Sequence, residues 1–232
     1  MKLSMILLHS VFGGLSNWAR VFNHFQDRFD ICVPELPLFE KHTGDTIEFL
    51  VGHLETFIDA VGSEKVVLIG NSLGGHIALR YTLKNPDKVS KLILTGSSGL
   101  YENTRFGSFL KRGNYAYIRE RVADTFFDPV MATDELVSEV MSVTTDAYKC
   151  LCMIRTAKST RRDNMFTRLP QIRVPVLLIW GEDDRVTPRD VATQFRDNLP
   201  DARLIMLSEC GHAPMMEKPG GFNIEAERFL FA

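Results

Sequence analysis

The sequence has few cysteines, little net charge and no long apolar run. Four cysteines in 232 residues are too few for a disulfide framework in a chain long enough to bury a large core, so we expect reduced thiols. The 27 lysines and arginines nearly balance the 29 aspartates and glutamates, and no basic block is present to neutralise phosphates. We therefore expect no nucleic-acid partner.

The apolar runs are short wherever they occur. The first run, residues 3–8, follows Lys2 and ends at His9, so it has neither the pattern of a signal peptide nor the roughly 20 residues of a membrane span. We expect a cytoplasmic protein with no membrane partner. Cys150 and Cys152 are separated by one residue, whereas zinc and redox pairs are typically separated by two, so we predict no metal and no other cofactor.

The sequence contains short apolar runs that alternate with amphipathic segments. Each run is rich in Val, Ile and Leu, is bounded by turn residues and precedes a segment of helical periodicity. This alternation predicts a parallel sheet with crossover helices. The predicted strands are residues 3–8, 30–34, 65–69, 91–95, 176–180 and 203–207, and the predicted helices are residues 15–29, 46–61, 73–83, 189–199 and 222–231.

One gap of about 80 residues interrupts the alternation, between Thr95 and Val176. Within it, residues 134–143 and 146–158 carry one-sided apolar stripes, which predict helices. No flexible Gly/Ser linker flanks the gap, so we expect a helical cap that packs on the core. The predicted boundaries are residues 1–96 and 171–232 for the core and residues 97–170 for the cap.

A serine lies at a predicted sharp turn between a strand and a helix. The third predicted strand leads into G-N-S-L-G-G, residues 70–75, and a helical segment follows. Such a turn needs small residues two positions before and after the serine, and Gly70 and Gly74 supply them. The first amides of the helix would face negative charge that forms near the Ser72 hydroxyl. The pattern indicates a serine nucleophile.

In this context the G-x-S-x-G motif resembles the nucleophile elbow of the α/β-hydrolase family. The family order is nucleophile, acid and histidine. Ser72 is followed by W-G-E-D-D-R-V-T-P at residues 180–188 and by C-G-H-A-P at residues 210–214, which are similar to the family's acid and histidine loops. The resemblance covers nearly the whole chain. It implies an α/β fold with a mostly parallel sheet of about six strands, helices on both faces and an inserted helical cap.

The resemblance also implies a catalytic triad. A serine hydroxyl does not ionise near neutral pH, so His212 would take its proton during attack and return it to the leaving group. Asp184 would hold the imidazole tautomer. Asp183 is the rival acid, and the spacing to Pro188 favours Asp184. His76 is a weaker candidate base, because it lies one helical turn beyond the serine.

The oxyanion hole is expected from two backbone N–H groups, those of Leu73 and, by resemblance, Val11. The family usually has glycine where Ser10 stands, so either the backbone there suits serine or the loop differs locally. We expect His9 to orient this loop. Residues 34–39 replace a glycine-rich loop of many relatives, so the pocket mouth is expected to be unusual.

Aromatic residues and methionines are frequent in and around the predicted cap. We expect most of them to pack the cap on the sheet and a few to line an apolar pocket. The predicted pocket residues are Phe12, Phe106, Phe126, Phe127, Met141 and Met215. Four arginines either hold a substrate carboxylate or form a solvated face, namely Arg155, Arg161, Arg162 and Arg168.

The leading hypothesis is a serine hydrolase that cleaves a small, fairly apolar carboxylic ester through an acyl-enzyme, with this small molecule as its partner. The alternative is a hydrolase of carbon–carbon bonds in ring-cleavage products of aromatics, because Asn71, Gly75 and residues 92–100 resemble that branch. Such enzymes, however, carry a tryptophan soon after the catalytic histidine and an arginine in the cap, whereas A-P-M follows His212 here. A second alternative is a ligand-binding receptor on the same fold, which an intact triad disfavours.

Overall fold

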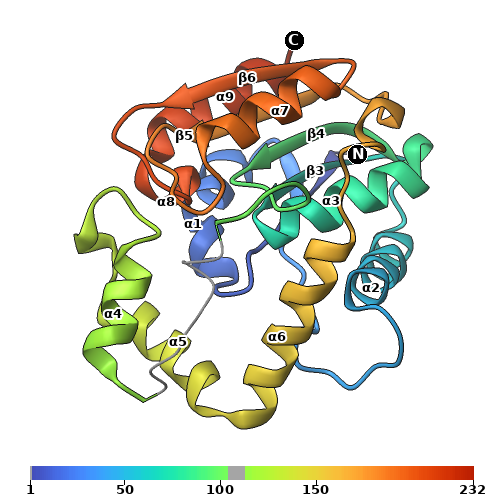
Figure 1. Cartoon of the computed structure of the whole chain (residues 1–232). Coiled ribbons are helices and arrows are strands. Elements are labelled where there is room, and N and C mark those ends of the chain that lie inside the picture. The colour runs from blue at the N-terminus through green and yellow to red at the C-terminus, as the bar shows by residue number, and fades with distance from the viewer. Residues whose placement is uncertain (1, 104–112) are drawn as a thin grey trace.

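The computed structural model describes residues 2–103 and 113–232. The described residues form a six-stranded sheet in the order β2-β1-β3-β4-β5-β6 (Figure 1). All neighbouring strands are parallel, so the predicted parallel sheet of about six strands is confirmed. Its strands are β1 (Leu3–Leu8), β2 (Phe29–Cys32), β3 (Val66–Asn71), β4 (Val89–Thr95), β5 (Val176–Gly181) and β6 (Ala202–Leu207).

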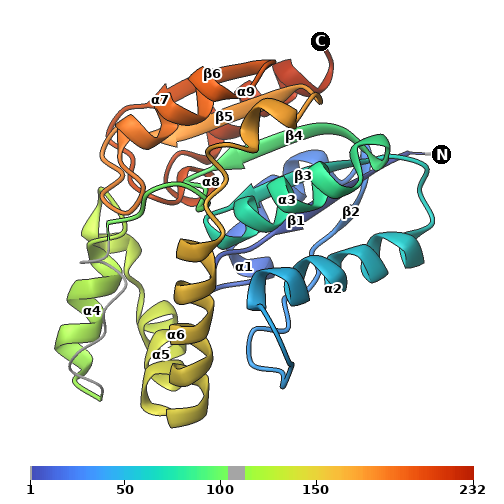
Figure 2. The ribbon, with the colours of Figure 1, turned by 45° about the vertical axis from the view of Figure 1, so that its right-hand side comes forward.

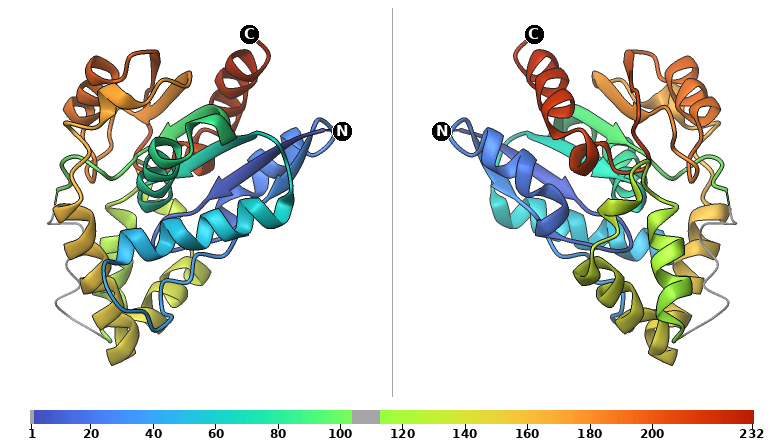
Figure 3. Two further views of the ribbon diagram at one scale, coloured as in Figure 1. Left: turned by 90° about the vertical axis from the view of Figure 1, so that its right-hand side faces the viewer. Right: turned by 90° about the vertical axis from the view of Figure 1, so that its left-hand side faces the viewer.

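Helices cover both faces of this sheet, as Figure 3 shows from two sides. Side chains alternate between the faces, so that Leu68 packs on one face while Val67 and Ile69 pack on the other. Helices α2, α3 and α7 cover the first face and α1, α8 and α9 the second. These helices are α1 (Leu15–Phe25), α2 (Thr46–Val61), α3 (Leu73–Lys84), α7 (Arg189–Asn198), α8 (Pro214–Glu217) and α9 (Pro219–Leu230), and a 3₁₀ turn, η1 (Pro86–Lys88), follows α3.

Two of the predicted core helices begin or end three or more residues away from the predicted position. The first was expected to reach residue 29 but ends at Phe25, because Phe29 already pairs with Leu3 at the start of β2. The last was expected from residue 222 but begins at Pro219, a residue whose fixed φ and missing N–H suit the first position of a helix. By contrast, α2 has the predicted bounds, because the Asp45 carboxylate accepts the N–H groups of its first turn.

Three α-helices of the described residues lie between β4 and β5, where an inserted cap was expected. They extend away from the carboxyl ends of the strands (Figure 2), and α6 packs against α2. Two of them match the predicted helical segments, whereas the first was not predicted. No helix of the described residues is long and apolar enough to cross a membrane. The three helices between β4 and β5 are α4 (Tyr115–Ala123), α5 (Asp134–Thr145) and α6 (Ala147–Arg162). Two 3₁₀ turns, η2 (Pro129–Met131) and η3 (Leu169–Gln171), lie in the same insertion.

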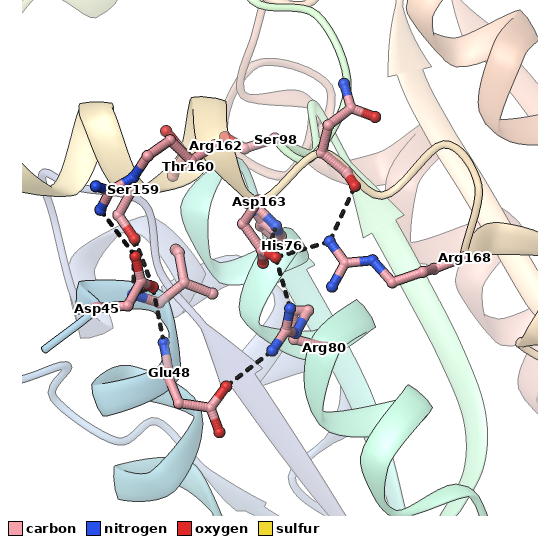
Figure 4. Close-up of polar contacts among 12 residues, drawn as sticks. Asp45, Glu48, His76, Arg80, Ser98, Ser159, Thr160, Arg162, Asp163 and Arg168 are labelled. Carbon is pink, nitrogen blue, oxygen red and sulfur yellow. Dashed lines mark hydrogen bonds and ion pairs between the residues drawn. The ribbon is translucent and has the colours of Figure 1, made fainter.

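Ion pairs tie the end of α6 to the core helices (Figure 4). Asp163 accepts hydrogen bonds from Arg80 at 2.5 Å, from Arg168 at 2.7 Å and from Nε2 of His76 at 3.1 Å. Arg162 pairs with Asp45 at 3.0 Å. Arg162 and Arg168, two of the arginines considered for a substrate carboxylate, therefore have carboxylate partners within the protein.

Candidate active site

Ser72 occupies a strained turn between β3 and α3. Its φ of 53° and ψ of −118° lie in a region that residues with a side chain rarely adopt. Three backbone hydrogen bonds hold it there. The Ser72 N–H donates to the carbonyl of Thr95 at 3.1 Å, and its own carbonyl accepts from the N–H of His76 at 3.2 Å and of Ser98 at 3.0 Å. The turn is therefore fixed by its neighbours, as expected of a nucleophile elbow.

The turn also needs a residue without a side chain at Gly74. A Cβ atom there would lie 2.2 Å from the carbonyl oxygen of Leu8 and 2.7 Å from that of His9. The first turn of α3 thus packs directly on the backbone where β1 ends. This close approach brings the loop of the predicted oxyanion hole against the serine.

Asp184 and His212 form a buried hydrogen-bonded pair. Nδ1 of His212 lies 2.9 Å from Oδ2 of Asp184, and both residues are buried. Oδ1 of Asp184 accepts the N–H groups of Val186 and Thr187, and Oδ2 also accepts the Thr187 hydroxyl at 2.8 Å. The rival Asp183 is exposed. The geometry thus selects Asp184 as the partner of the histidine.

The pair has a marked effect on the His212 imidazole. Burial lowers the pKa of His212, but the charge and hydrogen bond of Asp184, together with the charges of Glu102 and Glu217, outweigh burial and raise the pKa above its ordinary value. An imidazole in this environment accepts a proton readily. This property is what a general base for a serine hydroxyl requires.

The elbow and the histidine loop lie side by side. The Asn71 side chain donates to the carbonyl of His212 at 3.1 Å and to that of Thr95 at 3.0 Å. Gly96 follows Thr95, and a Cβ at Gly96 would lie only 2.8 Å from Nδ1 of His212. Asp184 and His212 are therefore in contact after β5 and β6, and Ser72 directly follows Asn71, whose side chain binds the His212 loop at the end of β3.

The loop after β1 is held by His9. Nε2 of His9 accepts the N–H of Leu36 at 3.0 Å, so the proton is on Nδ1, which donates to the carbonyl of Ser10 at 2.6 Å. Burial lowers the pKa of His9 below its ordinary value. The described non-glycine residues with positive φ are Ser72 and Glu209, so Ser10 has an ordinary φ that serine readily adopts. Val11 follows in this loop and Leu73 begins α3, and their role as oxyanion donors stays a prediction.

The predicted pocket residues differ in their surroundings. Phe126 and Met215 are buried in the core cluster of the second sheet face, and Phe12 and Met141 are partly buried against the same cluster. Phe127 is exposed, and Phe106 lies outside the described residues. Their role as a substrate pocket stays a prediction. Among the described residues, no group of three or more His, Cys, Asp or Glu side chains is placed to hold a metal ion.

Three residues around the site have contacts that the sequence did not suggest. The Thr187 hydroxyl binds Asp184, and α7 begins after Pro188. Glu217 accepts backbone N–H groups beside His212. His76, the weaker candidate base, is bound to Asp163. A threonine three residues after the acid was the available signal for the first of these contacts.

Comparison with known proteins identifies the family. Residues 5–226 match the alpha/beta hydrolase family, so the chain belongs to it. A 2-hydroxy-6-oxononadienedioate/2-hydroxy-6-oxononatrienedioate hydrolase of Paraburkholderia xenovorans is 31% identical over 98% of this chain and 86% of its own length. A 2-hydroxy-6-oxo-6-phenylhexa-2,4-dienoate hydrolase of Comamonas testosteroni is 28% identical over 94% of this chain and 83% of its own length.

A solved structure is also similar to this chain. It is that of an alpha/beta hydrolase enzyme from the metagenome of sediments of the Mar Chica lagoon, Morocco. The two chains are 36% identical, with a TM-score of 0.80 over 98% of this chain and 90% of the other. The predicted family and fold are therefore confirmed.

Proposed function

We propose that the chain is a serine hydrolase that breaks the carbon–carbon bond beside the 6-oxo group of a 2-hydroxy-6-oxo-dienoate. Ser72 is the nucleophile, His212 the base and Asp184 the acid. The observation that carries the proposal is the 2.9 Å pair of Asp184 and His212 beside the Ser72 elbow, in a chain whose relatives named above hydrolyse such compounds.

The chemistry of these compounds fits the proposed residues. They contain no ester or amide bond, so their hydrolysis must break a carbon–carbon bond next to a carbonyl. Ser72 attacks that carbonyl while His212 takes the hydroxyl proton. The N–H groups of Leu73 and Val11 stabilise the oxyanion. Before this attack, the 2-hydroxy dienoate moves its hydroxyl proton to C5, which gives the 2-oxo form. When the oxyanion collapses, the C5–C6 bond breaks, its electron pair passes through the C3–C4 double bond to the 2-oxo oxygen, and His212 returns its proton there. His212 then takes a proton from water, which attacks the acyl carbon and releases the carboxylic acid and the Ser72 hydroxyl.

Ester hydrolysis, the leading expectation from the sequence, is the second candidate. The observation in its favour is Ala213, which follows His212 where carbon–carbon hydrolases carry a tryptophan nearby. The relatives named above favour the first candidate. The same three residues would serve both reactions, because each begins with attack on a carbonyl carbon.

Parallel assays separate the two candidates. In the first assay the substrate is 2-hydroxy-6-oxo-6-phenylhexa-2,4-dienoate, and its hydrolysis is measured as the loss of its visible absorbance. In the second assay the substrates are p-nitrophenyl esters from acetate to octanoate, and release of p-nitrophenol is measured. Ser72→Ala should lose about 10³- to 10⁶-fold in kcat, whereas Ser16→Ala, at an exposed site on α1, should keep full activity. Turnover of the dienoate well above the esters supports the first candidate, and the reverse supports the second. Full activity in Ser72→Ala would refute both.

A further inference from the structure

The loop that carries His212 is held by a carboxylate from the helix that follows it. Glu217 is the last residue of α8, and its side chain turns back toward the loop. Its Oε1 accepts the backbone N–H of Gly211 at 2.9 Å and that of Ala213 at 3.4 Å. These residues directly precede and follow His212, so one oxygen binds the backbone on both sides of the imidazole.

The second oxygen of Glu217 reaches the insertion between β4 and β5. Oε2 accepts the N–H of Phe127 at 2.7 Å, in the segment after α4. In the same segment, the carbonyl oxygen of Thr125 accepts a hydrogen bond from the backbone N–H of His212 at 2.8 Å. The insertion and the histidine loop are thus joined in both directions, and Glu217 is the acceptor they share.

The two segments are in direct backbone contact. A Cβ at Gly211 would lie 2.7 Å from the carbonyl oxygen of Thr125 and 2.8 Å from the nitrogen of Phe127. Because no side chain separates the segments, a change in the bonds to Glu217 would shift the His212 backbone directly. Shifts of about 1 Å in catalytic groups can cost on the order of 100-fold in rate.

The charge of Glu217 also acts on the imidazole. Burial raises the pKa of Glu217, and the backbone N–H groups that bind its carboxylate oppose this rise. Three carboxylates favour the imidazolium form of His212, namely Asp184 after β5, Glu102 after β4 and Glu217 on α8. Glu217 therefore contributes both hydrogen bonds and charge near the proposed base.

We propose that Glu217 is a positioning residue for His212, whose carboxylate holds the backbone on both sides of the imidazole and ties it to the inserted helices. The inference rests on the proposed function, because it assigns Glu217 to the alignment of the proposed base. Glu217 acts through the loop rather than on the substrate.

The test compares the wild type with Glu217→Gln, Glu217→Asp and a control, Glu209→Gln. The rate at which a fluorophosphonate modifies Ser72 is measured against pH, with the adduct located by mass spectrometry. The glutamine keeps the size but loses the charge and one accepting atom, so labelling should slow by about 10- to 100-fold and its pH midpoint should fall.

Glu217→Asp separates the two contributions of the carboxylate. It keeps the charge but is one methylene too short to bind both segments, so labelling should slow while the midpoint stays near that of the wild type. Glu209 is exposed, pairs with Lys218 and immediately precedes Cys210. Its substitution makes the same chemical change near the same loop and should leave both quantities unaltered.

Equal rates and midpoints in the wild type and Glu217→Gln would overturn the inference. Absence of labelling at Ser72 in the wild type would instead refute the proposed function. Hydrogen exchange of the folded proteins then decides the inference, since loss of the carboxylate should speed exchange at Phe127, Gly211 and Ala213. Unchanged exchange there would contradict it. Thermal melting checks that each variant is folded, and if Glu217→Gln does not fold, Glu217→Asp carries the same comparisons.

Discussion

Oδ2 of Asp184 lies 2.9 Å from Nδ1 of His212, although the two residues are 28 positions apart in the chain. Asp184 follows β5 and His212 follows β6, and these strands are neighbours in the sheet. Because the carboxyl ends of parallel strands meet at one edge, the sheet order itself brings the two loops together. Ser72, at the end of β3, lies at the same edge.

Asp184→Asn should lower kcat by up to about 10⁴-fold, because an asparagine cannot hold the imidazole in the tautomer that accepts the serine proton. The matched control is Asp183→Asn, which makes the same change one residue away at an exposed position. Steady-state rates of both variants, on whichever substrate the wild type turns over, check this assignment. Comparable losses in the two variants would mean that the acid has been misidentified.

The rate should rise with pH as His212 loses its proton. The pKa of His212 is raised above its ordinary 6.5, because Asp184, with Glu102 and Glu217, outweighs the opposing effect of burial. The base is active when neutral, so we expect kcat/KM to rise to a plateau with a midpoint above 6.5. The same raised pKa stabilises the fold fully below pH 6.5, and this contribution is lost as pH rises through the folded value.

A profile of kcat/KM from pH 5 to 9 measures that midpoint. In Asp184→Asn the midpoint should fall, because the largest charge that favours the imidazolium has been removed. A midpoint that stays in place in this variant would show that another group titrates.

The elbow could be predicted from its local pattern, and the acid–base pair from the resemblance of residues 180–188 and 210–214 to the acid and histidine loops of the family. The glycines around Ser72 and the strand before it indicate a sharp turn, which backbone hydrogen bonds with Thr95 and Ser98 then hold. Asp184 and His212 follow successive strands, and these strands are neighbours in the parallel sheet, so the two residues lie at the same edge. The ends of helices and strands could not be predicted in the same way, because they depend on pairing between distant segments. Phe29 was predicted to be helical but belongs to β2, where it pairs with Leu3.

The contacts of Glu217 could not be read from the sequence. The Glu217 carboxylate binds Phe127, which is 90 residues away in the chain, and nothing in either local pattern points to the other. Helix α4 was also missed, because its sequence shows little helical periodicity. It buries only Ile118 and Val122, and a single pair of apolar residues is too short a stripe to reveal a helical period.

Gly74→Ala should destabilise the fold, because the new Cβ would lie 2.2 Å from the carbonyl oxygen of Leu8. Backbone atoms cannot move aside as a flexible side chain can, so a loss of about 3 kcal/mol or more in unfolding free energy is expected. Gly52→Ala is the matched control, in the interior of α2 with nothing within 4 Å of the new Cβ. It should stabilise the protein by about 0.5 to 1 kcal/mol. Urea unfolding of the pair measures both changes.

Asp163→Asn should loosen the attachment of α6 to α3. The Asp163 carboxylate forms ion pairs with Arg80, Arg168 and His76. Loss of its charge should lower the free energy of unfolding by about 1 to 3 kcal/mol. Asp87→Asn, at an exposed site in η1, should have no measurable effect. Guanidinium unfolding at pH 7 gives the comparison.

The pH dependence of this effect separates the ion pairs of Asp163 from its packing. Burial raises the pKa of Asp163, but the hydrogen bonds and charges of His76, Arg168 and Arg80 outweigh it and lower the pKa well below its ordinary 3.8. A carboxyl with a depressed pKa stabilises the fold above its unfolded value, and the contribution is lost as pH falls through the folded one. The difference in stability between the wild type and Asp163→Asn should therefore shrink as the pH falls below 4. A difference that persists unchanged into acid would show that the asparagine disturbs packing rather than charge.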